Sequence, residues 1–138
     1  MDCLFCKIVS GEIPSYKIFE DYFTLAFLDI NPVSRGHAVV IPKIHVSAFT
    51  EMKPDDAALL FSSVNKVTKT LLETLGAPAA NIGLNNGELA GQVVPHVHVH
   101  IIPRYENDGG GSMHSIVSSE VDTGDLEDLA KQVLGNFQ

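Results

Sequence analysis

The chain has 138 residues, and 45% of them are hydrophobic, which is enough for one domain with its own core and excludes disorder as its overall state. Nine Lys and Arg stand against 17 Asp and Glu, so the formal net charge is −8. Because no stretch gathers basic residues, we expect neither nucleic acid nor an anionic membrane as a partner. A local site for one phosphate stays possible. We treat residues 1–138 as a single domain.

The N-terminal sequence MDCLFCKIVSGEIP carries an acid at position 2 and no basic segment ahead of an apolar one, so it is not typical of a secretory signal. No apolar run has the length of a membrane-spanning helix. These features predict a cytoplasmic protein. In that compartment two cysteines are thiols or metal ligands rather than a disulfide.

The first part of the chain predicts a short helix and three strands. Residues 3–10 are an apolar stretch followed by a glycine, which is typical of one or two helical turns. Residues 15–20 and 23–28 are rich in β-branched and aromatic side chains and predict a hairpin. After an Asn-Pro turn, residues 37–41 predict a third, largely buried strand.

The second part predicts one long helix, two more strands and a terminal helix. Between Pro54 and Gly76 the pattern has a helical period, with one apolar stripe made of Leu60, Val64, Val67, Leu71 and Leu75. Residues 81–84 and 96–102 predict strands, and residues 126–134 predict a helix beyond a glycine run. This order of elements predicts an α+β domain with an antiparallel sheet of about five strands.

The most informative segment is PHVHVHIIP, residues 95–103. Alternate residues of a strand point to opposite faces, so His96, His98 and His100 share one face and the apolar residues between them share the other. A strand face turned only to solvent is normally built from Thr, Lys, Glu or Ser. A row of three imidazoles therefore favours a functional site.

Two kinds of chemistry fit this row. An H-x-H pair such as His98 and His100 can hold a catalytic zinc ion with an open position. Alternatively, a neutral imidazole attacks phosphorus while neighbouring donors neutralise the phosphate oxygens. The loop before the row contains Asn85, Gly91 and Gln92. These residues provide side-chain and backbone amides of the kind that a phosphate site needs, which favours phosphorus chemistry.

Cys3 and Cys6 form a C-x-x-C pair, which is half of a tetrahedral zinc site. We expect His45 and His96 to complete a closed site for a structural zinc ion, because His96 lies outside the pair needed for phosphoryl chemistry. The alternative is that both cysteines are free thiols, packed as small apolar residues.

Residues 95–102 resemble the signature of the histidine-triad (HIT) family of nucleotide-binding proteins. The resemblance continues at residues 27–30, 36–45 and 85–92, and it covers about residues 3–105. It implies the HIT fold, with residues 106–138 as a tail and helix. It also implies a homodimer that pairs through the long helix and an edge strand. The cysteine pair resembles bacterial Hint-like members of the family.

The resemblance further implies roles for single residues. His98 matches the nucleophile that attacks the α-phosphorus of a nucleoside 5′-phosphoryl compound and forms a covalent nucleotidyl-histidine, which water then hydrolyses. His100, Asn85 and Gln92 match groups that contact the phosphate, and Asp29 matches the acid that binds the ribose hydroxyls. The other implied nucleotide-binding residues surround the base or border the phosphate: Leu4, Phe5, Ile8, Phe27, Ile30, Gly91 and Val93.

Together these matches predict an enzyme that cleaves purine nucleoside 5′-phosphoramidates, binds an AMP-type ligand and needs no catalytic metal. Val93 stands where the Hint branch usually carries Ser or Thr beside the leaving group, so no hydroxyl delivers a proton there. Residues 101–104 resemble the dinucleoside-polyphosphate branch instead. Hydrolysis of dinucleoside polyphosphates is therefore one alternative, and a nucleotide-binding regulatory module with little turnover is another.

Overall fold

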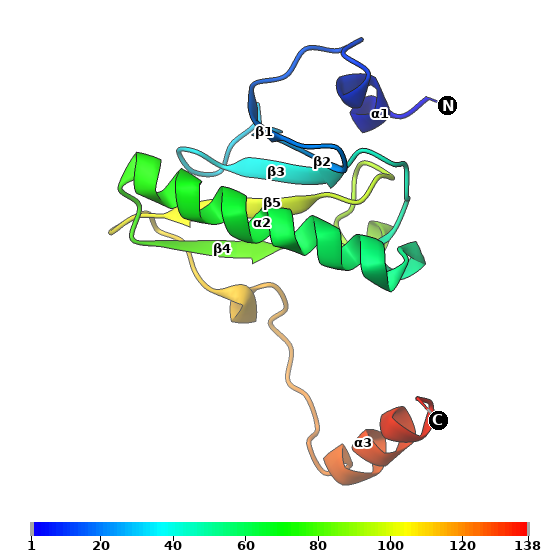
Figure 1. Cartoon of the computed structure of the whole chain (residues 1–138). Coiled ribbons are helices and arrows are strands. Elements are labelled where there is room, and N and C mark those ends of the chain that lie inside the picture. The colour runs from blue at the N-terminus through cyan, green and yellow to red at the C-terminus, as the bar shows by residue number, and fades with distance from the viewer. Residues whose placement is uncertain (1, 138) are drawn as a thin grey trace.

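The computed structural model describes residues 2–137 and contains one five-stranded antiparallel sheet in the order β1-β2-β3-β5-β4 (Figure 1). The strands are β1 (Lys17–Glu20), β2 (Thr24–Leu28), β3 (Ala38–Pro42), β4 (Ala79–Gly83) and β5 (Val99–Arg104). The helices are α1 (Leu4–Val9), α2 (Pro54–Leu75) and α3 (Leu126–Gly135). The predicted α+β fold with one long helix and short terminal helices is confirmed.

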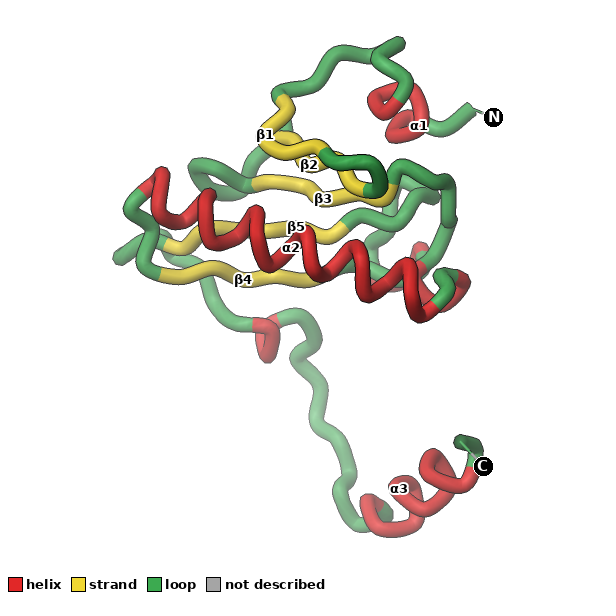
Figure 2. Tube along the Cα trace, in the orientation of Figure 1, coloured by secondary structure: helices red, strands yellow, loops and turns green. Residues whose placement is uncertain are grey.

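Helix α2 lies along one face of the sheet (Figure 2) and has the bounds that its apolar period predicts. Pro54 begins it with two acids in the first turn, and Gly76 ends it in the left-handed conformation at φ 63°. The predicted stripe packs against Val40, Val99 and Ile101 of the sheet, and its first three residues and Leu71 are buried.

Helix α1 covers the opposite face of the sheet. Phe5 and Ile8 pack there against Phe27, Val39 and Ile41, in a second cluster of buried side chains. Strand β3 is buried at every residue, because α2 covers one of its faces and the N-terminal segment covers the other. This second, smaller core also brings the N-terminal cysteines to the sheet.

The histidine row differs from its prediction in one respect. Strand β5 begins at Val99, so His96 and His98 precede the ladder instead of lying in it. Pro95 has no N–H to donate, and the His96 N–H bonds to the Val94 carbonyl in a turn. The alternation still holds, because Val97 is buried in the core below α2, on the side away from the imidazoles.

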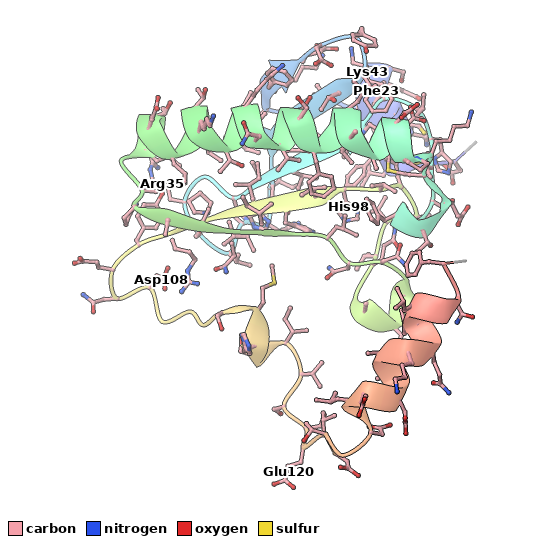
Figure 3. The ribbon with its side chains drawn as sticks, turned by 60° about the horizontal axis from the view of Figure 1, so that its bottom comes forward. Phe23, Arg35, Lys43, His98, Asp108 and Glu120 are labelled. Atoms are coloured by element: carbon pink, nitrogen blue, oxygen red, sulfur yellow. The ribbon has the colours of Figure 1, made fainter. Side chains whose placement is uncertain are left out.

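The tail leaves the domain beyond β4. In Figure 3, Glu120 of the tail lies far from the sheet and from His98. Its root is fixed by Arg104, whose guanidinium donates to Asp108 at 2.8 Å and to Asn81 at 2.6 Å. The same ion pair lowers the pKa of the Asp108 carboxyl. Every residue from 106 to 137 is exposed. Within residues 2–137, no helix combines the length and the apolar character needed to cross a bilayer.

Candidate functional site

His98 is held in a single tautomer by the backbone next to it. Its Nδ1 lies 2.7 Å from the His96 carbonyl oxygen, which only accepts hydrogen bonds, so Nδ1 carries the proton. Nε2 therefore keeps its lone pair. The ring of Phe5 meets the ring of His98 edge to face, with centroids 5.1 Å apart, and His98 is only 8% exposed. The residue predicted as the nucleophile thus presents an unprotonated nitrogen.

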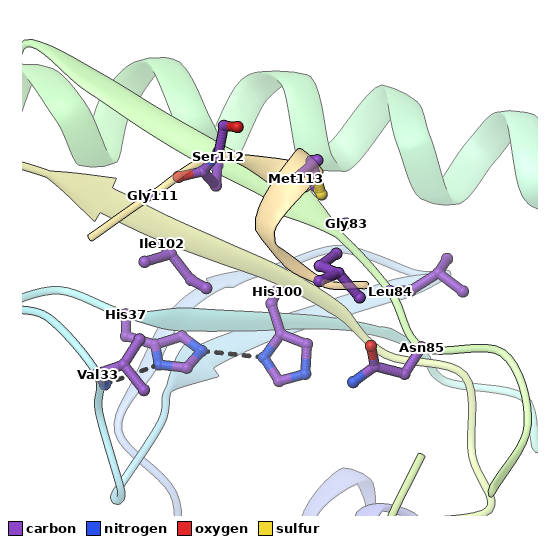
Figure 4. A pocket seen from close by; sticks show the side chains of 12 residues that line it. Val33, His37, Gly83, Leu84, Asn85, His100, Ile102, Gly111, Ser112 and Met113 are labelled. Atoms are coloured by element: carbon purple, nitrogen blue, oxygen red, sulfur yellow. Dashed lines mark hydrogen bonds between the residues drawn. The ribbon is translucent and has the colours of Figure 1, made fainter. Parts of the chain in front are cut away.

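His100 is oriented through His37, the residue that begins the third predicted strand. The Val33 N–H donates to Nδ1 of His37 at 3.1 Å, so His37 carries its proton on Nε2. That N–H donates to Nδ1 of His100 at 2.9 Å (Figure 4). His100 is thereby left with a proton on Nε2. One backbone amide thus sets the tautomers of two imidazoles in series, and His100 becomes a hydrogen-bond donor.

The imidazoles of His37 and His100 both stay neutral near pH 7. Burial lowers the pKa of His100 to about 4, and the positive charges that His98 and His37 would carry add to the effect. Burial also lowers the pKa of His37, although the Asp29 carboxylate opposes the change. His37 has to be neutral in this hydrogen-bonded series, because its Nδ1 accepts a hydrogen bond from the Val33 N–H.

This arrangement makes stability depend on pH. The unfolded chain protonates His100 at its ordinary pKa of 6.5, whereas the folded chain does so at about 4. Between these values the unfolded state binds more protons, so the free energy of unfolding rises with pH through this window and levels off above it. Urea unfolding of His100→Asn between pH 4 and pH 7 is expected to give a shallower rise than the wild type. The exposed His114→Asn serves as the control, and equal slopes for all three proteins would contradict the assignment.

A cavity of about 460 Å³ lies between α1, β2 and the histidine row. Apolar side chains from α1 and β2 line one part of it, and polar groups line the rest, including the Asp29 carboxylate and both imidazoles. Of the residues predicted to bind a nucleotide, the following line this cavity: Leu4, Phe5, Ile8, Phe27, Asp29, Ile30, Asn85, Gly91, Val93, His98 and His100. The remaining lining residues were not predicted as part of a nucleotide site: Ile13, Pro14, Ser15, Leu28, Asn31, Val39 and Val94.

Gln92 lies outside this cavity, and its amide is engaged by its own loop and by the segment that follows β3. Its Nε2 donates to the carbonyls of Ser47 at 2.6 Å and Val94 at 3.1 Å, and its Oε1 accepts from the Gly87 N–H at 2.8 Å. Gly91 has φ 102°, a conformation that glycine adopts without strain. Gln92 therefore holds the loop in which Gly91 and the exposed Val93 border the cavity.

A second cavity, of about 350 Å³, shares Asn85 and His100 with the first (Figure 4). Its other walls are mostly apolar and include Val33, Leu84 and Met113, which comes from the tail. Nothing in the sequence pattern pointed to this cavity, because tail and sheet residues meet only in the folded chain.

The four predicted metal ligands form one cluster. Cys3 caps α1, Cys6 lies one turn later, His45 follows β3 and His96 precedes β5, and their donor atoms all lie within 4.8 Å of one another. The sulfur of Cys3 is 3.5 Å from His96 Nδ1, and the sulfur of Cys6 is 3.4 Å from His45 Nδ1. A tetrahedral zinc ion with its usual bond lengths separates S and N ligands by about 3.5 Å.

The tautomer of His96 also suits a metal. Its Nε2 donates to the Pro42 carbonyl at 2.9 Å, so the lone pair is on Nδ1, the atom that faces both sulfurs. Burial lowers the pKa of His96, which keeps the ring neutral. The donor set, its spacing and its protonation therefore fit a closed zinc site.

The metal cluster and the nucleophile are neighbours in structure. Phe5 sits between the two cysteines in sequence, and its ring packs edge to face against Phe27, His96 and His98. The His96 backbone carbonyl is also the acceptor that fixes His98. Groups that hold the cluster in place therefore also position the cavity wall and the nucleophile.

A sheet of this topology with a histidine row at the start of β5 defines an α+β domain of the histidine-triad type. A family model described as the HIT domain matches residues 10–107, and the chain belongs to this family. An adenosine 5′-monophosphoramidase of Schizosaccharomyces pombe is 46% identical over 110 residues, which are 80% of this chain and 80% of that protein.

Two solved structures are similar to this chain over nearly its whole length. The Streptococcus mutans protein SMU.412c is 44% identical and superposes with a TM-score of 0.90, covering 99% of this chain and 86% of that chain. A zinc-bound histidine triad family protein of Mycobacterium smegmatis is 34% identical, with a TM-score of 0.75 over 100% of this chain and 99% of that chain.

Proposed function

We propose that the protein hydrolyses purine nucleoside 5′-phosphoramidates, or transfers their nucleotidyl group, through a covalent nucleotidyl-His98. The observation that carries this proposal is the pair of opposite tautomers in one cavity. His98 presents a lone pair on Nε2, and His100 presents a proton on Nε2. A nucleophile beside a neutral donor is what attack on an anionic phosphoryl group needs. The S. pombe phosphoramidase relative supports the same reaction.

In the first step, Nε2 of His98 attacks the α-phosphorus and the P–N bond breaks. The amine leaves with its bonding electron pair and takes up a proton. Val93 is 89% exposed and has no hydroxyl, so we assign this proton to solvent water. In the second step, water attacks the same phosphorus, loses a proton to solvent and displaces His98. The products are a nucleoside monophosphate and the free amine.

His100 and Asn85 are proposed to donate to the phosphate oxygens, with the backbone amides around Gly91. His37 is proposed as a positioning residue, because it reaches the phosphate only through His100. Gln92 supports the loop from outside. This assignment differs from the one implied by the resemblance, in which the Gln92 amide itself contacts the phosphate.

The base is proposed to lie among the apolar residues of α1 and β2, and Asp29 is proposed to accept the ribose hydroxyls. One Asp29 oxygen accepts from the Asn31 N–H at 2.8 Å, as in an ordinary turn. The other lies 3.6 Å from Nε2 of His37 and borders the cavity. Asp29 therefore has capacity for a ligand beside its turn role.

The Cys3, Cys6, His45 and His96 cluster is proposed to bind a structural zinc ion. A bound ion would cross-link the N-terminal turn to the strand ends and would take no part in the chemistry on the substrate. The proposed homodimer pairs through α2 and the edge strand β4, as the resemblance implies.

Hydrolysis of dinucleoside polyphosphates is less well supported. Arg104, the cation that the polyphosphate branch suggested, is engaged by Asp108, Asn81 and the Gly111 carbonyl. It therefore has no free donor set for additional phosphates. The mostly apolar second cavity beside His100 also offers no cationic side chain.

The proposal is tested by acid quenching of adenosine 5′-phosphoramidate turnover, followed by mass spectrometry of the protein. We expect an adenylyl adduct on His98 that decays to AMP. Turnover with no adduct, together with activity that disappears and returns with catalytic zinc, would favour a metal mechanism. Binding of the nucleotide without turnover would favour the alternative of a nucleotide-binding regulatory module.

The role of Asp29 predicts discrimination between sugars. Removal of the 2′-hydroxyl from the substrate is expected to lower kcat/KM by about 10-fold to 100-fold in the wild type, because an acceptor loses its partner. Asp29→Ala is expected to treat the two substrates alike. Equal kcat/KM values for ribo and deoxyribo substrates in the wild type would refute the assignment.

A further inference from the structure

One hydroxyl in the wall of the 460 Å³ cavity has no hydrogen-bond partner among residues 2–137. Ser15 lines this cavity, and its Oγ is buried from solvent without a donor or acceptor from the described chain. A buried hydroxyl without a partner costs stability, because it has given up its hydrogen bonds to water. Alanine would fill the same place without this cost. The hydroxyl therefore needs an explanation other than folding.

The backbone on both sides of Ser15 is anchored. On one side, the Ile13 N–H donates to the Lys7 carbonyl of α1 at 3.1 Å. On the other side, the Tyr16 carbonyl accepts from the Leu28 N–H of β2 at 3.0 Å. Ser15 is thus held at a fixed place between α1 and the end of β2. Rotation about χ1 is enough to turn its hydroxyl toward the cavity that the residue lines.

The order of the strands places Ser15 at the end of the cavity that is remote from the phosphate groups (Figure 1). Ser15 lies just before β1, whereas His100 belongs to β5, and strands β2 and β3 lie between them. Three strand spacings of about 4.8 Å separate these positions by about 14 Å. Asp29, which is proposed for the ribose, follows β2 and lies between the two ends. This order across the sheet matches the order of base, ribose and phosphate in a nucleotide.

Ser15 also provides a covered polar group that the contacts proposed so far leave unused. The polar residues that line the cavity are Ser15, Asp29, Asn31, Asn85, His98 and His100. Asp29 is proposed for the ribose, and the last three are proposed for the phosphate. Asn31 is exposed, so its amide keeps water as a partner. The unpartnered hydroxyl at the base end is therefore the group that gains most from a polar ligand atom.

We infer that Ser15 reads the base: its hydroxyl turns into the cavity and forms a hydrogen bond with one polar atom on the edge of a bound purine. The inference rests on the nucleotide site proposed above and adds to it a residue that determines base specificity. A purine edge presents ring nitrogens that accept and an exocyclic amino group or oxygen, and a hydroxyl both donates and accepts. One bond therefore replaces the water that the base loses and satisfies the Ser15 hydroxyl.

The first test measures binding by calorimetry with AMP and with the 5′-monophosphate of 4-methylindole riboside. The indole ring has the shape of a purine but carries C–H groups and a methyl group where adenine has its polar edge atoms. The wild type is expected to prefer AMP, and Ser15→Ala is expected to reduce this preference by about tenfold. Ser15→Thr keeps a hydroxyl and is expected to retain most of the preference. The same preference in the wild type and in Ser15→Ala would overturn the inference.

Ser34→Ala is the matched control for this experiment. The hydroxyl of Ser34 is also buried without a partner among residues 2–137, but Ser34 lines neither of the two cavities described above. Its removal is expected to leave the preference for AMP at the wild-type value. A loss equal to that of Ser15→Ala would mean that the effect does not come from contact with the base, and would overturn the inference.

Thermal unfolding separates base reading from a structural role of the hydroxyl. Ser15→Ala removes an unpartnered polar atom, so the Tm of the ligand-free protein is expected to stay equal or to rise slightly. AMP is expected to raise the Tm of the variant less than that of the wild type, because it binds the variant more weakly. A lower Tm of the ligand-free variant would show that the hydroxyl stabilises the fold, and would overturn the inference.

The last test identifies the edge atom. The 1-deaza, 3-deaza and 7-deaza analogues of AMP each replace one ring nitrogen by C–H, and purine riboside 5′-monophosphate lacks the amino group. One of the four is expected to bind the wild type about tenfold more weakly than AMP, and to bind Ser15→Ala as AMP does. Losses of the same size in both proteins for every analogue would refute the inference alone. These measurements need no turnover, so binding as expected without hydrolysis of the phosphoramidate would refute only the proposed function.

Discussion

His98→Ala is expected to lose at least about 10³-fold in kcat while it still binds AMP. The substitution removes the nitrogen that forms the covalent bond but leaves the apolar wall and the Asp29 carboxylate in place. Steady-state kinetics on adenosine 5′-phosphoramidate and AMP titration by calorimetry measure the two effects. His114→Ala is the matched control, because His114 is exposed on the tail and lines none of the cavities described above.

Two outcomes would speak against the covalent mechanism. Turnover close to the wild-type value would mean that another group performs the attack. A fall in bound zinc that parallels the fall in kcat would instead make His98 a ligand of a catalytic metal. Under the proposed mechanism, the zinc content of His98→Ala equals that of the wild type.

Cys6→Ser is expected to reduce bound zinc toward zero and to lower Tm. A metal that binds only the folded state contributes its binding free energy to folding, and the hydroxyl of Ser is a much poorer zinc ligand than a thiolate. Metal analysis of protein purified without chelator and thermal unfolding measure these effects. The change in activity is expected mainly in KM, because Phe5 loses support as a wall of the cavity.

Lys7→Ala is the control for this experiment. Lys7 lies beside Cys6 on α1 and makes only an exposed ion pair with Asp2, so its loss costs little stability. Wild-type protein with less than about a tenth of an equivalent of zinc or a similar ion would return both cysteines to ordinary thiols. In that case His96 would be a buried neutral imidazole that is hydrogen-bonded to the Pro42 carbonyl.

The elements that follow a clear period were predictable from the sequence. Helix α2 has both its stripe and its end signals in the local sequence, so its bounds agree with the prediction. The separation of imidazoles from core residues also follows from alternation alone, although β5 starts later than predicted. In both cases the deciding information lies within a few neighbouring residues.

The parts that sequence reasoning missed depend on contacts between distant segments. The role of His37 has no local signal, because its link to His100 needs β3 beside β5 and the Val33 N–H within reach of its ring. Gln92 resembles a phosphate donor in sequence, yet the carbonyls of Ser47 and Val94 take its amide protons. No local pattern encodes where such partners will lie.

His96 serves the two neighbouring sites through different atoms. Its ring faces the cysteines, whereas its backbone carbonyl fixes the tautomer of His98. Every amino acid has that carbonyl, so replacement of His96 removes a metal ligand without removing the acceptor. The metal cluster and the nucleophile are therefore separable in evolution: a lineage that loses the cysteine pair keeps the means to hold its central histidine ready for attack.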